Sequence, residues 1–347
     1  MKTHRAGVAC ALLVAGMVWM APPAAMAAEP VRLILETDIG NDIDDTLALA
    51  LIHALENRGE VELLAVTITK DNLYAAPFVS LMDTYYGRPE IPIGVVHDGK
   101  AKDTTAMLEV PVEMKLGNGQ PVFPHRLKNG NDASEAVALL KQVLAGQPDH
   151  SVTIAQIGFS TNLSRLVSSP EGKELVEKKV KLLCLMAGNF GPKPQPEYNI
   201  YTDAEAAKNL LANWPTDMIF SGFEIGITVM FPYADIERDF QYASQHPVVV
   251  AFKAFAKPGE DRPNYDSTAV LEAIRGDRGY FELSEPGRVT LDEKNITVFT
   301  PDPQGKCRYM ILKPENRARV QELLVTLSSE PPEQKLLSGT ASQRVTF

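Results

Sequence analysis

The sequence predicts a single α/β domain with a mainly parallel central sheet flanked by helices and a small C-terminal β-hairpin. Short apolar runs alternate with helical patterns along the chain, and neither an internal repeat nor a long low-complexity linker divides it. Runs that are apolar throughout are typical of strands buried on both faces, and strands that alternate with helices form βαβ units. We therefore expect one domain over residues 28–347.

The elements can be predicted in order along the chain. The expected strands are "VRLILET" (31–37), "VELLAVTIT" (61–69), "IPIGVV" (91–96), "SVTIAQIG" (151–158) and "KVKLLCLMAG" (179–188). The expected helices are 44–59, 75–87, 132–146 and 203–213. Residues 98–130 contain scattered Gly, Pro and Asn and are expected to be irregular. Residues 287–312 alternate and turn at "DPQG", which predicts the hairpin, and a last helix is expected near 315–328.

Residues 1–27 are predicted to be a secretory signal peptide. Lys2 and Arg5 precede an apolar run from Ala6 to Ala21, and "AAMA" (24–27) offers a small-x-small cleavage site. The run is too short and wrongly flanked for a spanning helix, and no later run approaches that length. We expect an exported protein, periplasmic or secreted, that has no membrane partner.

Charge and cysteine content narrow the partners further. The formal net charge is −10 and no Lys/Arg cluster occurs, which argues against nucleic acid as a partner. Outside the predicted signal peptide, the cysteines are Cys184, inside an apolar run, and Cys307. A small core side chain is the expected role for Cys184. The sequence leaves open whether these two thiols pair.

The segment "LETDIGNDIDDTLALAL" (35–51) carries the main chemical signal. Asp38, Asp42, Asp44 and Asp45 crowd together without a cation in the segment, and like charges this close raise one another's pKa. Asp44 and Asp45 suit the first turn of a helix, but the helix dipole does not explain the other two.

Other acidic or phosphate-binding motifs fit poorly. An EF-hand loop beginning at Asp38 would need Gly and Glu where Ile43 and Leu49 stand. A haloacid-dehalogenase-type phosphatase would need an aspartate where Glu36 stands, and a dinucleotide fold would not place carboxylates beside a pyrophosphate. A hard divalent cation with oxygen ligands remains, and calcium fits an irregular carboxylate cage better than magnesium.

The same segment resembles the N-terminal signature of the inosine-uridine-preferring nucleoside hydrolase family, in which a strand leads into Asp-x-Asp-x-Gly-x-Asp-Asp and a helix. Further segments resemble the family's later motifs in the same order, over residues 31–328: "IGFSTNL" (157–163), "LMAGNF" (185–190), "PEYNIYTDAEAAKNLL" (196–211) and "NYDSTAVLEAI" (264–274). Several motifs in one order are much more specific than one motif alone.

The resemblance implies a role for each matching residue. Asp38 would ligate Ca²⁺ and take a proton from the attacking water, and Asp44 would bind the sugar hydroxyls. The other implied calcium ligands are Asp45, Asp266 and the backbone carbonyl of Thr161. Further expected substrate contacts, mostly by motif position, are Asn72, Met186, Asn189, Glu197, Tyr198 and Asn199. His97 is added because it follows the third expected strand, and strand ends face the ligand in such sheets.

Three departures from the family pattern affect these roles. Asn41, Asp42 and Ile43 stand where the family has one residue, so Asp42 and Asp44 are both candidates for the sugar hydroxyls. Glu36 replaces the first aspartate of the signature. Tyr265 stands where many members have the histidine that protonates the leaving base, and a phenol with a pKa of about 10 suits that task less well.

The expected function is calcium-dependent hydrolysis of the N-glycosidic bond of ribonucleosides, giving free base and ribose. Cleavage of this bond builds positive charge on the sugar, which a carboxylate-lined site tolerates. Because of Tyr265, two alternatives remain: a calcium-dependent sugar or nucleoside binding protein, and a hydrolase restricted to ribosides with good leaving groups. The resemblance also suggests a homodimer or homotetramer, while the base preference stays open.

Overall fold

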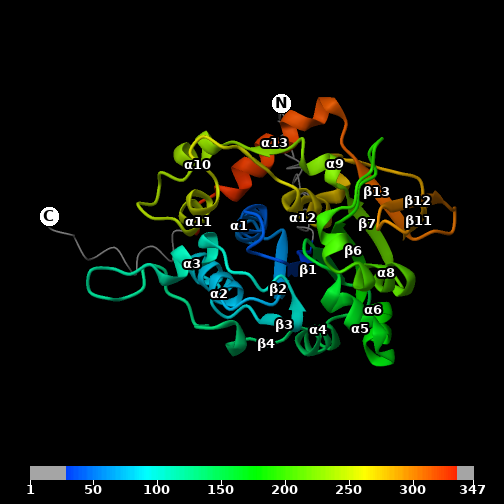
Figure 1. Ribbon diagram of the computed structural model, residues 1–347, viewed down its shortest axis with the longest axis horizontal. Helices are drawn as coiled ribbons and strands as arrows, with labels where there is room; N and C mark the ends of the chain where they lie inside the picture. Colours follow the sequence, from blue (N-terminus) through cyan, green and yellow to red (C-terminus); the bar gives the residue numbers. More distant parts are fainter. Residues whose placement is uncertain (1–28, 334–347) are drawn as a thin grey trace, which may run out of the picture.

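A mainly parallel β-sheet forms the middle of the molecule (Figure 1). The structure is a computed structural model that describes residues 29–333, so the predicted signal peptide lies outside the described residues. The strands are β1 (Val31–Thr37), β2 (Val61–Lys70), β3 (Ile93–Lys100), β4 (Ser134–Glu135), β5 (Val152–Gln156), β6 (Val180–Met186), β7 (Asp217–Ser221), β8 (Met230–Phe231), β9 (Arg262–Pro263), β10 (Glu282–Leu283), β11 (Gly287–Leu291), β12 (Thr297–Pro301) and β13 (Cys307–Ile311).

The order of the strands places a topological switch at β1. The main sheet runs β12-β11-β13-β7-β6-β5-β1-β2-β3-β4, and every pair from β13 to β4 is parallel. From β1 the chain moves outward through β2, β3 and β4, then returns to the other side of β1 with β5. In open α/β sheets, ligands bind beyond the carboxyl ends of the strands at such a point.

Helices cover both faces of the sheet, as the sequence predicts. They are α1 (Asp44–Asn57), α2 (Ala75–Tyr85), α3 (Ala106–Glu113), α4 (Ala136–Ala145), α5 (Thr161–Ser168), α6 (Pro170–Lys179), α7 (Tyr198–Thr202), α8 (Ala204–Asn213), α9 (Phe223–Gly226), α10 (Tyr233–Asp239), α11 (Pro247–Phe255), α12 (Asp266–Arg275) and α13 (Pro314–Ser328), with 3₁₀ turns at Gly130–Asp132 and Gly276–Arg278.

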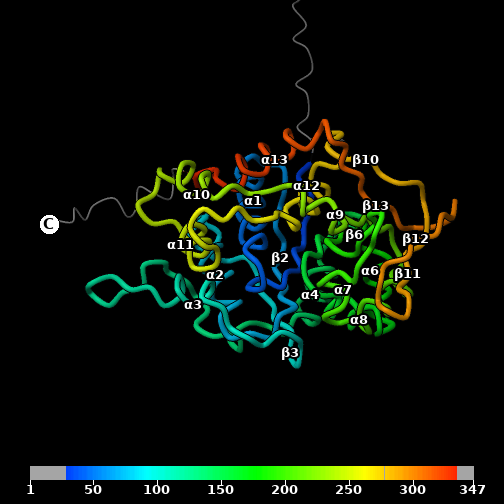
Figure 2. The backbone as a smooth tube through the Cα atoms, turned by 45° about the horizontal axis from the view of Figure 1, so that its top comes forward, coloured from blue at the N-terminus to red at the C-terminus, as the bar shows by residue number. Residues whose placement is uncertain are grey.

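The two faces have separate apolar cores. Leu33 and Leu35 of β1 pack with α1, α2, α12 and α13, whereas Ile34 packs with α4, α5, α6 and α8. Figure 2 shows β2 between these two groups of helices. Because successive strand residues point to opposite faces, a strand covered on both sides must be apolar throughout.

Two expectations about local structure were wrong. Residues 98–130 are not wholly irregular, because β3 continues to Lys100 and α3 follows, even though Pro111 lies inside that helix. The C-terminal hairpin exists, but it joins β11 to β12 and turns near Asp292–Asn295, upstream of "DPQG". After "DPQG", β13 leaves β12 and lies parallel to β7 in the main sheet.

The strand order also decides the question of the disulfide. Cys184 on β6 and Cys307 on β13 are free and buried, and β7 lies between their strands. Two strand spacings separate them by roughly 10 Å, whereas a disulfide needs Cα atoms within about 7 Å. Among the described residues, no helix combines the length and apolarity needed to cross a membrane.

Candidate active site

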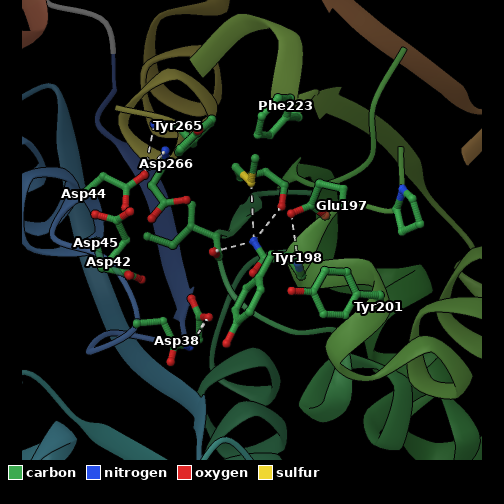
Figure 3. Close-up of a pocket in the computed structure, with 15 residues that line it drawn as sticks. Asp38, Asp42, Asp44, Asp45, Glu197, Tyr198, Tyr201, Phe223, Tyr265 and Asp266 are labelled. Atoms are coloured by element: carbon green, nitrogen blue, oxygen red, sulfur yellow. Dashed lines mark hydrogen bonds between the residues drawn. The ribbon is translucent and has the colours of Figure 1, made fainter. Parts of the chain in front are cut away.

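A cavity of about 460 Å³ opens beyond the carboxyl ends of β1, β5 and β6 (Figure 3). Its lining residues are Asp38, Asn41, Asp42, Asp44, Asp45, Ile157, Met186, Pro196, Glu197, Tyr198, Asn199, Tyr201, Phe223, Tyr265 and Asp266. The cavity therefore lies at the topological switch, and its size suits a small organic ligand. Among the described residues that line it, none is a lysine, arginine or histidine.

Three buried carboxylates from two helices gather at one end of the cavity. Asp44 and Asp45 occupy the first turn of α1, and Asp266 occupies the first turn of α12. One oxygen from each lies within 4.8 Å of the others. The two helix N-termini favour negative charge here, and Asp44 accepts the backbone N–H groups of Tyr265 (3.0 Å) and Asp266 (3.2 Å).

Helix ends alone do not compensate for this charge. Burial raises the pKa of Asp44, Asp45 and Asp266 well above the usual range of an aspartate, and the neighbouring carboxylates raise it further. The Thr37 hydroxyl donates to Asp45, but no basic side chain contacts the three groups within the described residues. Oxygen donors of this kind suit a divalent cation, and such a cation would remove the repulsion.

The other two aspartates of the signature have different partners. Asp38, directly after β1, accepts a hydrogen bond from Asn41 Nδ2 at 2.5 Å, and burial raises its pKa to about 6. Asp42 is more exposed and forms an ion pair of 2.6 Å with Arg262. Asp44 therefore belongs to the group of three buried carboxylates, whereas Asp42 is neutralised by an arginine.

Residues from β5, β6 and α7 form the opposite wall. Glu197 caps α7 and accepts the backbone N–H groups of Asn199 (2.8 Å), Ile200 (3.1 Å) and Gly188 (3.1 Å). Burial raises the pKa of Glu197 to about 7. Asn199 Nδ2 in turn donates to the carbonyl oxygens of Ile157 and Met186, both at 3.0 Å. These bonds hold α7 against the ends of the two strands.

Aromatic rings line the cavity in two pairs. Phe223 and Tyr265 stack with ring centroids 5.4 Å apart, and Tyr198 and Tyr201 meet edge-to-face at 5.3 Å. Figure 3 shows Phe223 and Tyr265 on one side of the cavity and the two tyrosines on another. All four side chains retain solvent exposure, which distinguishes them from core aromatics. Such rings can stack on a planar heterocycle.

The structure brings most of the predicted site residues together. Of those inferred from the sequence, the ones that line the cavity are Asp38, Asp42, Asp44, Asp45, Met186, Glu197, Tyr198, Asn199, Tyr265 and Asp266. Glu36, the departure at the start of the signature, is fully buried outside the cavity and accepts hydrogen bonds from Thr67 and Asn162.

Four predicted residues lie elsewhere. Thr161 begins α5 and its hydroxyl donates to Asp203 at 2.6 Å, while Ile157, four residues earlier, lines the cavity instead. Asn72 donates hydrogen bonds from its amide nitrogen to the backbone carbonyls of Lys102 and Asp103, which holds that loop. His97 has an exposed side chain, and Asn189 accepts the backbone N–H of Gly191. Motif position and strand ends indicated the segments of these four residues but not which residues of each segment line the cavity.

Five cavity residues were not predicted: Asn41, Ile157, Pro196, Tyr201 and Phe223. Ile157 had a usable signal, since it directly follows β5, the strand beside β1, and strand ends face the ligand. Asn41 also had one, because it lies inside the acidic segment. Phe223 had no usable sequence signal, because β7, the strand that precedes it, was not predicted.

Comparisons with known proteins identify the family of this chain. The sequence model of the family "Inosine-uridine preferring nucleoside hydrolase" matches residues 33–326. The inosine-uridine preferring nucleoside hydrolase of Crithidia fasciculata is 27% identical over 197 residues, which cover 55% of this chain and 60% of that protein. The pyrimidine-specific ribonucleoside hydrolase RihA of Klebsiella pneumoniae is 28% identical over 230 residues, covering 63% of this chain and 68% of that protein.

Solved structures share the fold at lower identity. A plant nucleoside hydrolase, PpNRh1, superposes with a TM-score of 0.64 at 22% identity, covering 87% of this chain and all of that one. An inosine-uridine preferring nucleoside hydrolase from Bacillus anthracis gives 0.63 at 16% identity, covering 86% of this chain and 99% of that one. The family match over nearly all described residues shows that the chain belongs to the inosine-uridine preferring nucleoside hydrolase family.

Proposed function

We propose that this protein hydrolyses the N-glycosidic bond of ribonucleosides in a calcium-dependent reaction, releasing free base and ribose. The observation that carries the proposal is the cavity itself, in which three buried carboxylates lie opposite the Glu197–Asn199 wall with aromatic rings between. Family membership supports the reaction class. The predicted signal peptide supports a location outside the cytoplasm.

The donor set fits a calcium ion. Asp44, Asp45 and Asp266 supply oxygens close enough to share one cation, and Asp38 is near enough to Asp45 to raise its pKa. Calcium accepts six to eight oxygen ligands, which include backbone carbonyls. The sequence assigns the backbone ligand to Thr161, but Ile157 lines the cavity, so we propose the Ile157 carbonyl, which also accepts from Asn199 Nδ2, in its place. When bound, calcium would orient the vicinal hydroxyls of the ribose and lower the pKa of a neighbouring water.

The side chains of the cavity can perform the remaining steps. Asp38 takes the proton from the attacking water, a role that suits a carboxylate whose pKa is raised to about 6. Glu197 and Asn199 hold the outer hydroxyls of the sugar beside Met186. The surrounding carboxylates stabilise the positive charge that develops on the ribose ring as the bond breaks.

The departing base occupies the aromatic part of the cavity. Phe223, Tyr265, Tyr198 and Tyr201 offer faces and edges on which a planar base stacks. Burial raises the pKa of Tyr265 to about 12, so its phenol stays protonated and acts as a hydrogen-bond donor to the base. This site lacks a histidine acid among its described lining residues, which favours bases that depart with little protonation.

A substrate panel distinguishes this proposal from the two alternatives. The calcium-loaded protein is incubated with purine, pyrimidine and nicotinamide ribosides, and the release of reducing sugar is measured for the wild type and Asp38→Ala. We expect release from natural nucleosides that disappears in the variant. Release confined to the nicotinamide riboside indicates a hydrolase for good leaving groups. Tight binding of ribosides without any release indicates a binding protein and contradicts the proposal.

A further inference from the structure

A buried lysine lies directly behind the acidic segment. Lys70 ends β2, and its side chain is 1% exposed. Its ammonium group donates to Asn41 Oδ1 at 2.7 Å and to the Gly40 carbonyl at 3.2 Å. A buried lysine is costly unless its charge is compensated, so its presence here requires a reason.

The lysine fixes the orientation of the Asn41 amide. An ammonium group can only donate, so the amide oxygen of Asn41 must face Lys70. The amide nitrogen then faces the other way, and it donates to Asp38 Oδ2 at 2.5 Å. The three side chains form one chain of hydrogen bonds with a single direction, from Lys70 through Asn41 to Asp38.

We propose that Lys70 and Asn41 are positioning residues that hold the Asp38 carboxylate in the orientation needed for calcium binding and for proton transfer from water. The Asn41 bond engages Oδ2 of Asp38, a residue that lines the cavity. We call the hydrogen-bond chain from Lys70 through Asn41 to Asp38 the relay. Asn41 belongs to the stretch in which this signature is longer than the family pattern, so the additional residues supply the relay. The kinetic part of this inference rests on the proposed function.

The loop around Asn41 has an independent anchor, which provides a control. The Thr105 hydroxyl donates to the Gly40 carbonyl at 3.1 Å, the same oxygen that Lys70 contacts. Thr105 does not line the cavity, and its hydroxyl donates to Gly40 and not to Asp38. Thr105→Val therefore loosens the loop while leaving the bond from Asn41 to Asp38 intact.

Two substitutions at position 41 separate positioning from simple loop support. Asn41→Ala removes both hydrogen bonds. Asn41→Asp keeps an acceptor for Lys70 but replaces the donor to Asp38 with a like charge. If Asn41 only supports the loop, Asn41→Asp behaves like the wild type. If it positions Asp38, kcat falls about 10–100-fold in both variants, as for other residues that orient a metal ligand, while KM changes less than about threefold.

Calorimetry gives a second readout that does not depend on turnover. Calcium is titrated into chelator-treated wild type, Asn41→Ala and Thr105→Val, after thermal unfolding has shown that each is folded. We expect Asn41→Ala to bind calcium at least about tenfold more weakly, whereas Thr105→Val matches the wild type. Equal affinities in all three proteins overturn the relay, even if the wild type proves active. An inactive wild type whose affinity still falls in Asn41→Ala overturns the proposed function and supports the relay.

Discussion

At the level of single residues, the four aspartates of the acidic segment have different partners in the structure, although they look equivalent in the sequence. Asp44 and Asp45 join Asp266, Asp42 pairs with Arg262, and Asp38 accepts a hydrogen bond from Asn41. Asp266 comes from a helix more than 200 residues away, so the group of three carboxylates exists only in the folded chain. Removing one of its charges should weaken the cation site without disturbing the apolar core.

Asp266→Asn tests this group of carboxylates. We expect calcium affinity to fall at least about tenfold, which corresponds to about 1.4 kcal/mol, because one charge leaves the coordination cage while the side-chain volume stays. Isothermal titration calorimetry on chelator-treated protein measures it. Ser267→Ala is the control, since this neighbouring hydroxyl is buried and has no hydrogen-bond partner among residues 29–333. An Asp266→Asn protein that binds calcium like the control would show that the cation site lies elsewhere.

Tyr265→Phe tests the role of the phenol. With its pKa raised to about 12 by burial, Tyr265 is a poor proton donor near neutral pH, so the loss of its hydroxyl removes only a hydrogen bond. We expect kcat/KM to fall less than about tenfold, whereas the loss of a general acid typically costs 10²–10⁴-fold. A loss in that larger range would identify Tyr265 as the acid and contradict our assignment.

The sequence predicted the chemistry of the site better than its geometry. The acids, Glu197, Asn199 and Met186 were identified because motifs preserve residue types at fixed spacing. Thr161 was inferred from its motif position, whereas the structure places Ile157 and not Thr161 in the cavity lining, because a motif does not say which residue of a turn faces the cavity. Lys70 escaped notice because it belongs to a different strand, and only the pairing of β1 with β2 brings it beside Asn41.

At the scale of elements, a buried charge network joins α1 to α2 behind the site. His53 of α1 is fully buried, with Nδ1 2.9 Å from Glu56 and Nε2 3.1 Å from Asp83 of α2. Both ring nitrogens face carboxylates, an arrangement that favours the doubly protonated ring. Burial lowers the pKa of His53, but the hydrogen bonds to Asp83 and Glu56 outweigh it, so the pKa is raised above 6.5.

This network should make stability depend on pH. Because the folded pKa of His53 lies above the unfolded value, its stabilisation is complete below about pH 6.5 and is lost as the pH rises through the folded pKa. We expect His53→Leu to cost about 3–5 kcal/mol at pH 6, because it leaves the buried Asp83 carboxylate without its partner, and less at higher pH; Glu56 keeps its ion pair with Arg88. Urea unfolding at several pH values measures this difference.

A surface histidine provides the control for that experiment. His150 is exposed, and Asn tolerates its positive φ of 50°. His150→Asn should leave the pH dependence of unfolding unchanged. If the free energies of unfolding of the wild type and His53→Leu differ by the same amount from pH 6 to 9, the imidazole is not charged in the folded state.

Element prediction succeeded where the hydrophobic pattern was strong. The buried strands and α1 were placed within a few residues, because covering on both sides demands long apolar runs. The short α3 was missed because Pro111 inside it signals a break. The hairpin turn was misplaced because "DPQG" is also a turn, and only long-range pairing with β7 decides where the next strand lies.

At the scale of the whole molecule, the topology explains why distant segments make one site. The switch at β1 opens a crevice beside β5, and the N-termini of α1 and α12 meet there with α7. The two apolar cores hold these elements from opposite faces of the sheet. A cation in this crevice would connect the first and last thirds of the described chain through Asp45 and Asp266.

If this crevice is a calcium-dependent nucleoside hydrolase site, its activity depends on the cation. The most direct test measures reducing-sugar release from uridine and inosine by the purified protein after calcium removal, and again after calcium is restored. We predict that removal lowers the rate at least about 100-fold and that restoration recovers it, as expected when the cation supplies the acidified water and the ribose contacts. Hydrolysis that proceeds at an unchanged rate without calcium, or no hydrolysis in either state, would contradict the account.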